Sequence, residues 1–266
     1  MRGFMSDLIG RRPWPRATVF GRINLVGGFI VLWHYFSFDV VKWGLLALSL
    51  LVVCWWWDMY RERGGGSHTR GISFALRYGM ALFISSEILF FSAFFWSYFH
   101  GYWHPEDEGR DWTGSEYGAV ILDPYGLPFL NTLILLVSGI FVTMSHHGAI
   151  SRCGFTRPLL FITMALGVYF MYMQSVEYES SGFSANRRGY GTLFFVLTGF
   201  HGLHVRIGII LLAFALIRHN RKAMNEVKHV FHEAAAWYWH FVDVVWLGLY
   251  FFIYWYGMDG NGPNVL

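Results

Sequence analysis

Apolar residues form seven long stretches along this chain, and shorter polar segments separate them. A helix needs about 20 predominantly apolar residues to cross the hydrocarbon core of a membrane, because each residue advances it by about 1.5 Å. The pattern therefore predicts an all-α, polytopic membrane protein with seven transmembrane helices. The predicted spans are residues 23–38, 40–57, 72–100, 128–146, 159–178, 190–216 and 234–256.

The first three spans differ in length. The first is short and is interrupted by Gly27, Gly28 and His34. Residues 37–39 leave room only for a tight turn, so the second span should pack antiparallel to the first. The third is longer than a membrane is thick and should tilt within it or project from it.

Composition supports the membrane class. Only 14% of the 266 residues are charged, whereas a soluble domain usually has about 25%. The net charge of +3 is small, and no basic-aromatic patch suggests a nucleic-acid partner. Cys54 and Cys153 lie in different segments without a CxxC spacing, so they predict neither a disulfide framework nor a thiolate metal site. The Arg-rich N-terminus has no apolar region with a cleavage site and is interpreted as mature sequence.

The distribution of Lys and Arg predicts the orientation in the membrane. Most of them lie in the segments on the side of the N-terminus, and few lie on the other side. The basic residues of that poorer side are Lys42, Arg110, Arg187 and Arg188. The positive-inside rule then places the N-terminus on the matrix or cytoplasmic side.

Tryptophans gather near predicted span ends. Trp55, Trp56 and Trp57 close the second span, and Trp237 and Trp239 open the seventh. Because Trp is enriched at membrane–water interfaces, we interpret these residues as an aromatic belt rather than as part of a cofactor site.

One carboxylate, Glu87, lies in the middle of the third span. Side chains three and four residues apart share a helix face, so Glu87 should face Phe83, Ile84, Phe90 and Phe91. A charge at this depth is costly and often marks a functional site. A structural Glu that is bonded to a neighbouring helix explains the same pattern, and the residues themselves leave both interpretations open.

Two further polar pairs lie in the last two spans. His201 and His204 are three residues apart, as are His240 and Asp243, and Glu233 lies near the start of the seventh span. The His pair has a spacing that can serve a metal or two interhelical hydrogen bonds. A His–Asp pair can also satisfy itself.

Two alternative functions follow from these residues. A membrane di-iron site is disfavoured because the histidines are spread over the outer side, the middle and the inner side of the membrane, and the HxxH pairs lack a following third His. A proton-coupled transporter could use Glu87, Glu177 and His240 as a relay. However, neither a pair of broken helices nor an inverted repeat is visible.

Several motifs resemble one known family, cytochrome c oxidase subunit III, over nearly the whole chain. They are PWP at 13–15, RE at 61–62, LRYGM at 76–80, SEILFF at 86–91, LNT at 130–132, HH at 146–147, TGFHGLHV at 198–205 and AAWYWHFVDVVW at 235–246.

The resemblance implies a fold and a function. It implies two helix bundles, spans 1–2 (residues 1–71) and spans 3–7 (residues 72–266), with a V-shaped, phospholipid-holding cleft between them. It implies that haem and copper lie in the partner subunits I and II, and that this chain carries no redox centre. The complex would oxidise cytochrome c, reduce dioxygen to water and pump protons. This chain would stabilise subunit I, support proton uptake and protect the enzyme during turnover.

The resemblance also implies roles for individual residues. Glu87 matches the membrane-embedded carboxylate of the family. Six residues match or adjoin positions near lipid head groups, and cations at the inner surface suit anionic phosphates: Trp56, Glu62, His68, Arg218, Lys228 and His229. Five further intramembrane polar residues are expected to be structural, with no metal ligands among them: His201, His204, Glu233, His240 and Asp243.

Departures from the family pattern put in doubt the contacts to neighbouring subunits rather than the family. The loops 101–122 and 184–189 are rewritten, His232 replaces an expected Phe, and Arg206 replaces an expected aliphatic residue. We therefore expect different accessory subunits at the loops, and a carboxylate or lipid phosphate beside Arg206. The mitochondrial inner membrane is the preferred location, with a bacterial plasma membrane as the alternative. Subunit III of a quinol oxidase is the alternative function, although that relative typically lacks the first two spans.

Overall fold

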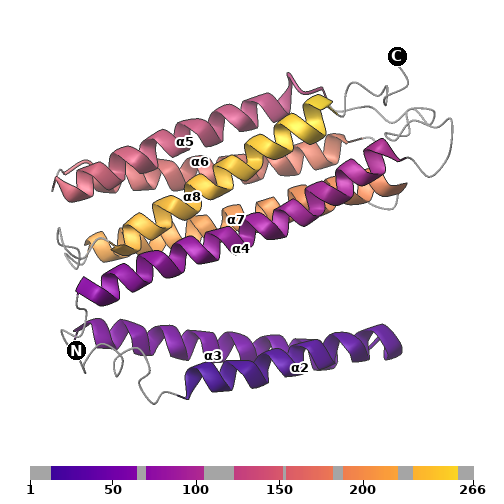
Figure 1. The fold of residues 1–266 in the computed structure, drawn as a ribbon. Helices are drawn as coiled ribbons and strands as arrows, with labels where there is room; N and C mark the ends of the chain where they lie inside the picture. The colour runs from indigo at the N-terminus through magenta and orange to yellow at the C-terminus, as the bar shows by residue number, and fades with distance from the viewer. Residues whose placement is uncertain are drawn as a thin grey trace. The chain divides into compact units, whose positions relative to one another are not determined.

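The computed structural model describes residues 13–64, 70–104, 123–151, 154–181, 188–220 and 230–256. Every regular element in these ranges is a helix, which confirms the all-α prediction. The elements are α2 (Trp14–Tyr35), α3 (Asp39–Gly64), α4 (Arg70–Trp103), α5 (Leu127–Ile150), α6 (Thr156–Ser180), α7 (Arg188–Asn220), α8 (Val230–Leu249) and the π-helix η2 (Tyr250–Trp255), as Figure 1 shows.

Six helices of the described chain are long and apolar enough to cross a membrane: α2, α4, α5, α6, α7 and α8 with its extension η2. The predicted second span, residues 40–57, lies within the helix α3. Because α3 is not among the six, its place in the membrane stays a prediction. The chain divides into two compact units, Met1–Leu76 and Arg77–Leu266.

The first unit contains a longer first helix than the apolar pattern predicted. Helix α2 begins at Trp14 rather than at residue 23, and it continues through Gly27 and Gly28 without interruption. A proline in the first turn explains the early start, because its missing N–H costs nothing there. The helix ends where Phe36 adopts a left-handed φ of 52° and donates its N–H to the carbonyl of Leu32.

Helices α2 and α3 pack antiparallel, as predicted from the short turn. A Cβ atom on Gly28 would lie 3.0 Å from the backbone nitrogen of Val41, and one on Gly44 would lie 3.2 Å from the Cα of Leu25. Contacts this short place backbone against backbone, which only a glycine allows. The contact partners run in opposite directions along the two helices, so the register is antiparallel.

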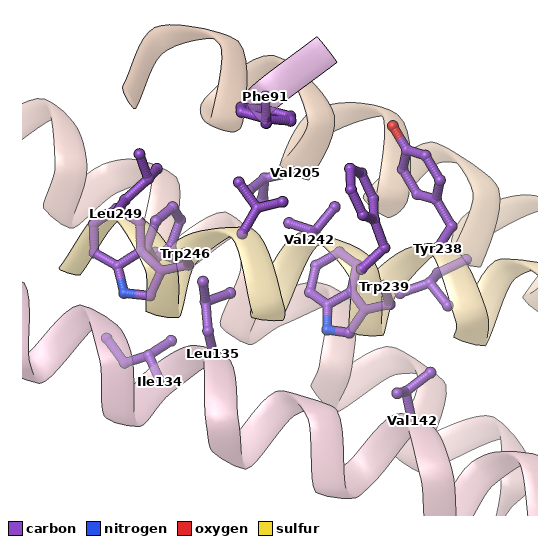
Figure 2. Packing of buried hydrophobic residues seen from close by; sticks show 14 of the residues in the cluster. Phe91, Ile134, Leu135, Val142, Val205, Tyr238, Trp239, Val242, Trp246 and Leu249 are labelled. Carbon is purple, nitrogen blue, oxygen red and sulfur yellow. The ribbon is translucent and has the colours of Figure 1, made fainter. Parts of the chain in front are cut away.

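The second unit is organised around α8. Helices α5, α6 and α7 lie side by side in chain order, and α8 packs against both α5 and α7, as Figure 1 shows. Two tryptophans of α8, Trp239 and Trp246, are almost fully buried in the shared core (Figure 2). Their indole nitrogens donate to the hydroxyls of Ser138 and Thr132 on α5, at 2.8 and 3.0 Å. The prediction that Trp239 belongs to an interfacial belt was wrong, because hydroxyls on a neighbouring helix satisfy its N–H inside the core.

Glycines make room for one of these rings. A Cβ atom on Gly167 of α6 would lie 2.6 Å from the indole of Trp239, and one on Gly208 of α7 would lie 2.8 Å from it. An alanine or any larger residue at either of these two positions would therefore overlap with the indole ring of Trp239. Small residues allow such close packing between membrane helices.

Helix α4 joins this unit through aromatic side chains. Phe91 is buried and its ring centroid lies 6.1 Å from that of Phe241 on α8. Phe90 and Phe94 both contact Phe200 of α7, with centroids 5.1 and 5.4 Å apart. Phe90, Phe91 and Phe94 thus form part of the surface through which α4 packs on this unit.

We expect Gly208→Ala to lower the free energy of unfolding by about 1–3 kcal/mol, the usual cost of overpacking a core. The new methyl group would collide with the rigid indole of Trp239. Gly199→Ala on the same helix is the matched control, because no atom of the described residues lies within 4 Å of its added Cβ. Thermal denaturation in detergent measures both, and equal midpoints for the two variants would contradict this packing.

Candidate functional site

Glu87 pairs with a histidine of another helix. Its Oε2 atom lies 3.0 Å from Nε2 of His204, which joins α4 to α7. Both side chains are largely buried, with 22% and 9% of their surfaces exposed. The sequence predicted a helix-bonded or functional Glu87 but not its partner. The sequence could have suggested this pairing, because a carboxylate and an imidazole in the middle of membrane spans each need a polar partner there.

The hydrogen bonds of His204 constrain the protons of this pair. Its Nδ1 atom lies 2.7 Å from the carbonyl oxygen of Phe200, and a carbonyl can only accept, so Nδ1 carries a hydrogen. The contact between Nε2 and Glu87 then contains one more proton. Either a neutral carboxyl donates it to Nε2, or the imidazolium donates it to the carboxylate. The pair can therefore hold a proton at a defined place between two helices.

Aromatic rings surround the pair. The rings of Phe91, Phe241 and Tyr238 have centroids 5.0, 6.0 and 6.3 Å from that of His204. Of the four predicted neighbours of Glu87, Phe90 and Phe91 both lie against the His204 ring, with centroids 6.3 and 5.0 Å away. Such a shell lowers the local dielectric and strengthens the polar contact inside it.

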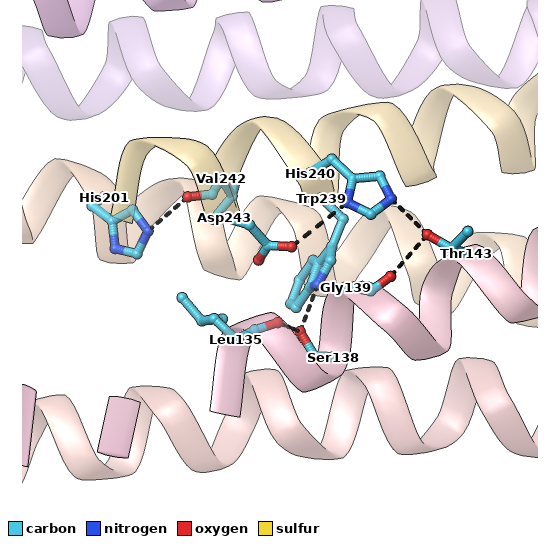
Figure 3. Close-up of polar contacts among 9 residues, drawn as sticks. All are labelled: Leu135, Ser138, Gly139, Thr143, His201, Trp239, His240, Val242 and Asp243. Carbon is cyan, nitrogen blue, oxygen red and sulfur yellow. Dashed lines mark hydrogen bonds and ion pairs between the residues drawn. The ribbon is translucent and has the colours of Figure 1, made fainter. Parts of the chain in front are cut away.

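His201 has a different partner from His204. It is buried, and its Nε2 atom lies 3.2 Å from the carbonyl oxygen of Val242 on α8 (Figure 3). The ring packs between Phe170 and Trp246, with centroids 5.5 and 5.1 Å away. The two histidines thus bind different helices and do not converge on one point. Among the residues that the structure describes, no group of three or more His, Cys, Asp or Glu side chains is placed to hold a metal.

His240 connects α8 with α5. Its Nδ1 atom lies 3.7 Å from Oδ2 of Asp243, and its Nε2 atom lies 3.0 Å from the hydroxyl of Thr143. That hydroxyl donates to the carbonyl of Gly139, so it accepts from Nε2 (Figure 3). The His–Asp pair is therefore in contact, and it also holds two helices together.

A second buried carboxylate, Glu177 of α6, binds the end of the last helix. Its Oε1 atom accepts a 2.5 Å hydrogen bond from the hydroxyl of Tyr254 on η2. Its Oε2 atom accepts from Nδ2 of Asn131 on α5 at 3.4 Å. Glu177 is fully buried. Sequence reasoning considered it only for a transporter relay, although a Glu in an apolar helix is a signal of the same kind as Glu87.

An ion pair joins the N-terminal part of α4 to α8. The Nε and Nη2 atoms of Arg77 both lie 2.8 Å from Oε2 of Glu233. Glu233, one of the predicted structural residues, therefore contacts the same helix that carries Glu87. These two polar contacts add to the aromatic packing of α4.

The predicted lipid-binding residues are only partly described. The guanidinium carbon of Arg218, near the C-terminal end of α7, lies 4.6 Å from the ring centroid of Phe231, near the N-terminal end of α8. The other five predictions, Trp56, Glu62, His68, Lys228 and His229, concern side chains outside the described residues. Lipid binding by this set stays a prediction.

A groove lies between α4 and α8 on the second unit. It has a volume of about 380 Å³, and its lining is apolar apart from Ser92 and His240. Ile88 and Phe95 line it from α4, and Val244 lines it from α8. The groove suits a methylene chain better than a polar ligand.

Comparisons with known proteins agree on one family. A family model described as cytochrome c oxidase subunit III matches residues 5–258. The chain is 43% identical over 254 residues to cytochrome c oxidase subunit 3 of Locusta migratoria, covering 94% of this chain and 95% of the relative. It is 42% identical over 253 residues to the protein of the same name from Drosophila melanogaster, covering 94% and 96%. The protein of this name from Polypterus ornatipinnis is 43% identical over 254 residues, with the same coverage of 94% and 96%.

We expect Tyr254→Phe to destabilise the second unit by about 1–3 kcal/mol, because the buried Glu177 would lose a hydroxyl donor without gaining another. Tyr250→Phe on the same element is the matched control. Among the described residues, the Tyr250 hydroxyl donates one hydrogen bond, to the carbonyl of Pro124 at 3.3 Å, so its loss should cost less. Denaturation of both purified variants provides the measurement, and a larger loss for Tyr250→Phe would show that the Glu177 contact is not structural.

Proposed function

The chain belongs to the cytochrome c oxidase subunit III family, and we propose that it acts as the non-catalytic core subunit that stabilises the redox subunits of this oxidase. It is a subunit of the terminal oxidase and a multi-pass protein of the mitochondrial inner membrane. In the proposed arrangement haem and copper lie in the partner subunits I and II, where cytochrome c is oxidised and dioxygen is reduced with proton pumping. The N-terminus faces the matrix, in keeping with the charge distribution.

The contact between Glu87 and His204 is the observation that carries the role in proton handling. The pair can hold a proton inside a shell of aromatic rings, at a contact between α4 and α7. We propose that it supports proton uptake by the neighbouring redox subunit and keeps that subunit intact during turnover. A carboxyl that exchanges a proton with an imidazole can do this without leaving an unpaired charge in hydrocarbon.

Phospholipid binding is the second part of the proposal. The groove between α4 and α8 is the place where an acyl chain would pack, since its lining is apolar and about 380 Å³ is open to it. The corresponding head group would be held at the inner surface by basic side chains such as Arg218. Lipid binding by Trp56, Glu62, His68, Lys228 and His229, which the family resemblance implies, is a separate part of the proposal.

The alternative of a quinol-oxidase subunit finds less support. Helices α2 and α3 are both present, whereas that relative typically lacks the first two spans. The relatives that match 94% of this chain carry the name of the cytochrome c oxidase subunit. No contact among the described residues favours a transporter that works alone.

We expect Glu87→Gln to leave assembly of the oxidase intact and to shorten its active life during turnover several-fold. The amide keeps a hydrogen-bonding group beside Nε2 of His204 but cannot gain or lose a proton. The measurement is oxygen consumption by the purified complex followed until activity is lost, together with its subunit content.

Ser85→Ala is the control, because this exposed serine of the same helix lies outside the groove lining and its hydroxyl donates to the backbone carbonyl of Ala81. A Glu87→Gln complex that fails to assemble would favour a purely structural carboxylate. A complex that assembles and lasts as long as the unaltered enzyme would remove Glu87 from proton handling.

A further inference from the structure

Arg206 is an isolated charge on the outer surface of α7. Between Tyr190 and Ile217 it is the one Lys, Arg, Asp or Glu in the sequence. Its side chain is exposed. Three apolar residues share this exposure, Leu203 and Ile210 one turn away on either side and Ile207 next in the chain, at 45%, 52% and 39%. We call these four residues the α7 face.

The described part of the chain offers Arg206 neither an ion pair nor a hydrogen bond. Each of the four carboxylates that are at least partly buried in the spans of the second unit already contacts another side chain. The pairs are Glu87 with His204, Glu177 with Tyr254, Glu233 with Arg77, and Asp243 with His240. The guanidinium therefore has no counter-ion among these groups.

The depth of Arg206 argues against a lipid phosphate as its partner. The membrane-crossing part of α7 runs from Tyr190 to His219, and Arg206 lies close to its middle. At about 1.5 Å per residue, Arg206 is about 24 Å from Tyr190 and about 20 Å from His219 along the helix. Its side chain has five bonds of about 1.5 Å from Cα to the guanidinium carbon, so it reaches no more than about 7 Å. The hydrocarbon core is about 30 Å thick, and head groups at either surface are out of reach.

We propose that the α7 face docks a transmembrane helix of another polypeptide of the oxidase, and that an Asp or Glu on that helix pairs with Arg206. A guanidinium at mid-depth is costly unless a group of opposite charge neutralises it. Leu203, Ile207 and Ile210 supply the apolar contact on either side of the charge. The pair would fix the register and the choice of partner. This inference rests on the proposed function as a subunit of a larger complex.

The first experiment identifies what covers the α7 face. A photo-reactive amino acid replaces Leu203 in the full chain, which keeps Arg206, and the assembled oxidase is illuminated and analysed by mass spectrometry. The expected product is a cross-link between position 203 and another polypeptide. The cross-linked segment of that polypeptide should span the membrane and contain an Asp or Glu. Cross-links to phospholipid alone, or to another part of this chain, would overturn the proposal.

The second experiment removes the charge. Arg206→Leu should reduce the amount of the covering polypeptide in the purified complex about tenfold or more, because its buried carboxylate would be left unpaired. Arg206→Lys should retain more of it, since the positive charge remains. Ile140→Leu, at an exposed position of α5 outside the α7 face, is the matched control and should leave the subunit content unchanged.

The outcomes separate this inference from the proposed function. If the unaltered chain does not co-purify with haem-bearing subunits, the proposed function fails. If it does, but Arg206→Leu retains every polypeptide at the unaltered level, only the docking of a partner helix fails. If Arg206→Leu prevents assembly altogether, the cross-link made in the presence of Arg206 decides the question.

Discussion

Every polar group that a helix carries into hydrocarbon must find a partner there, because water is absent and an unpaired group costs several kcal/mol. Helix α8 meets this constraint on two sides. Trp239 and His240 bond hydroxyls of α5, and the carbonyl of Val242 receives His201 of α7. Glu233 adds an ion pair with α4. The arrangement of the second unit depends on these contacts, because apolar packing alone does not distinguish one helix face from another in a lipid environment.

The same constraint gives Glu87 its place. Helix α4 packs through large aromatic side chains, which hold it beside its neighbours without fixing its rotation as strictly as a polar contact does. The bond to His204 and the pair of Arg77 with Glu233 provide two fixed points along it. A carboxyl at such a point orients the helix and can also hold a proton. The structural and the functional interpretations of Glu87 are therefore compatible.

The same constraint applies to Arg206, which is exposed on the surface of the second unit. The buried carboxylates of this unit contact side chains of the same chain, whereas Arg206 is exposed and has neither an ion pair nor a hydrogen bond among the residues that the structure describes. In a protein that works as a subunit, a carboxylate of a neighbouring subunit is the simplest partner for an exposed guanidinium in the middle of a membrane span. On the proposal made above, this departure from the family pattern marks a lineage-specific contact.

The sequence by itself determined the helical membrane class, the approximate spans and the family, because these depend on apolar run length and on local motifs. It also located the costly residues, Glu87 among them. It did not determine the partners, since the pairing of Glu87 with His204 depends on which faces of α4 and α7 meet. Trp239 was misplaced for the same reason: its burial depends on Gly167 and Gly208 of other helices. Periodicity predicts which residues share a helix face, but only tertiary packing decides which faces come into contact.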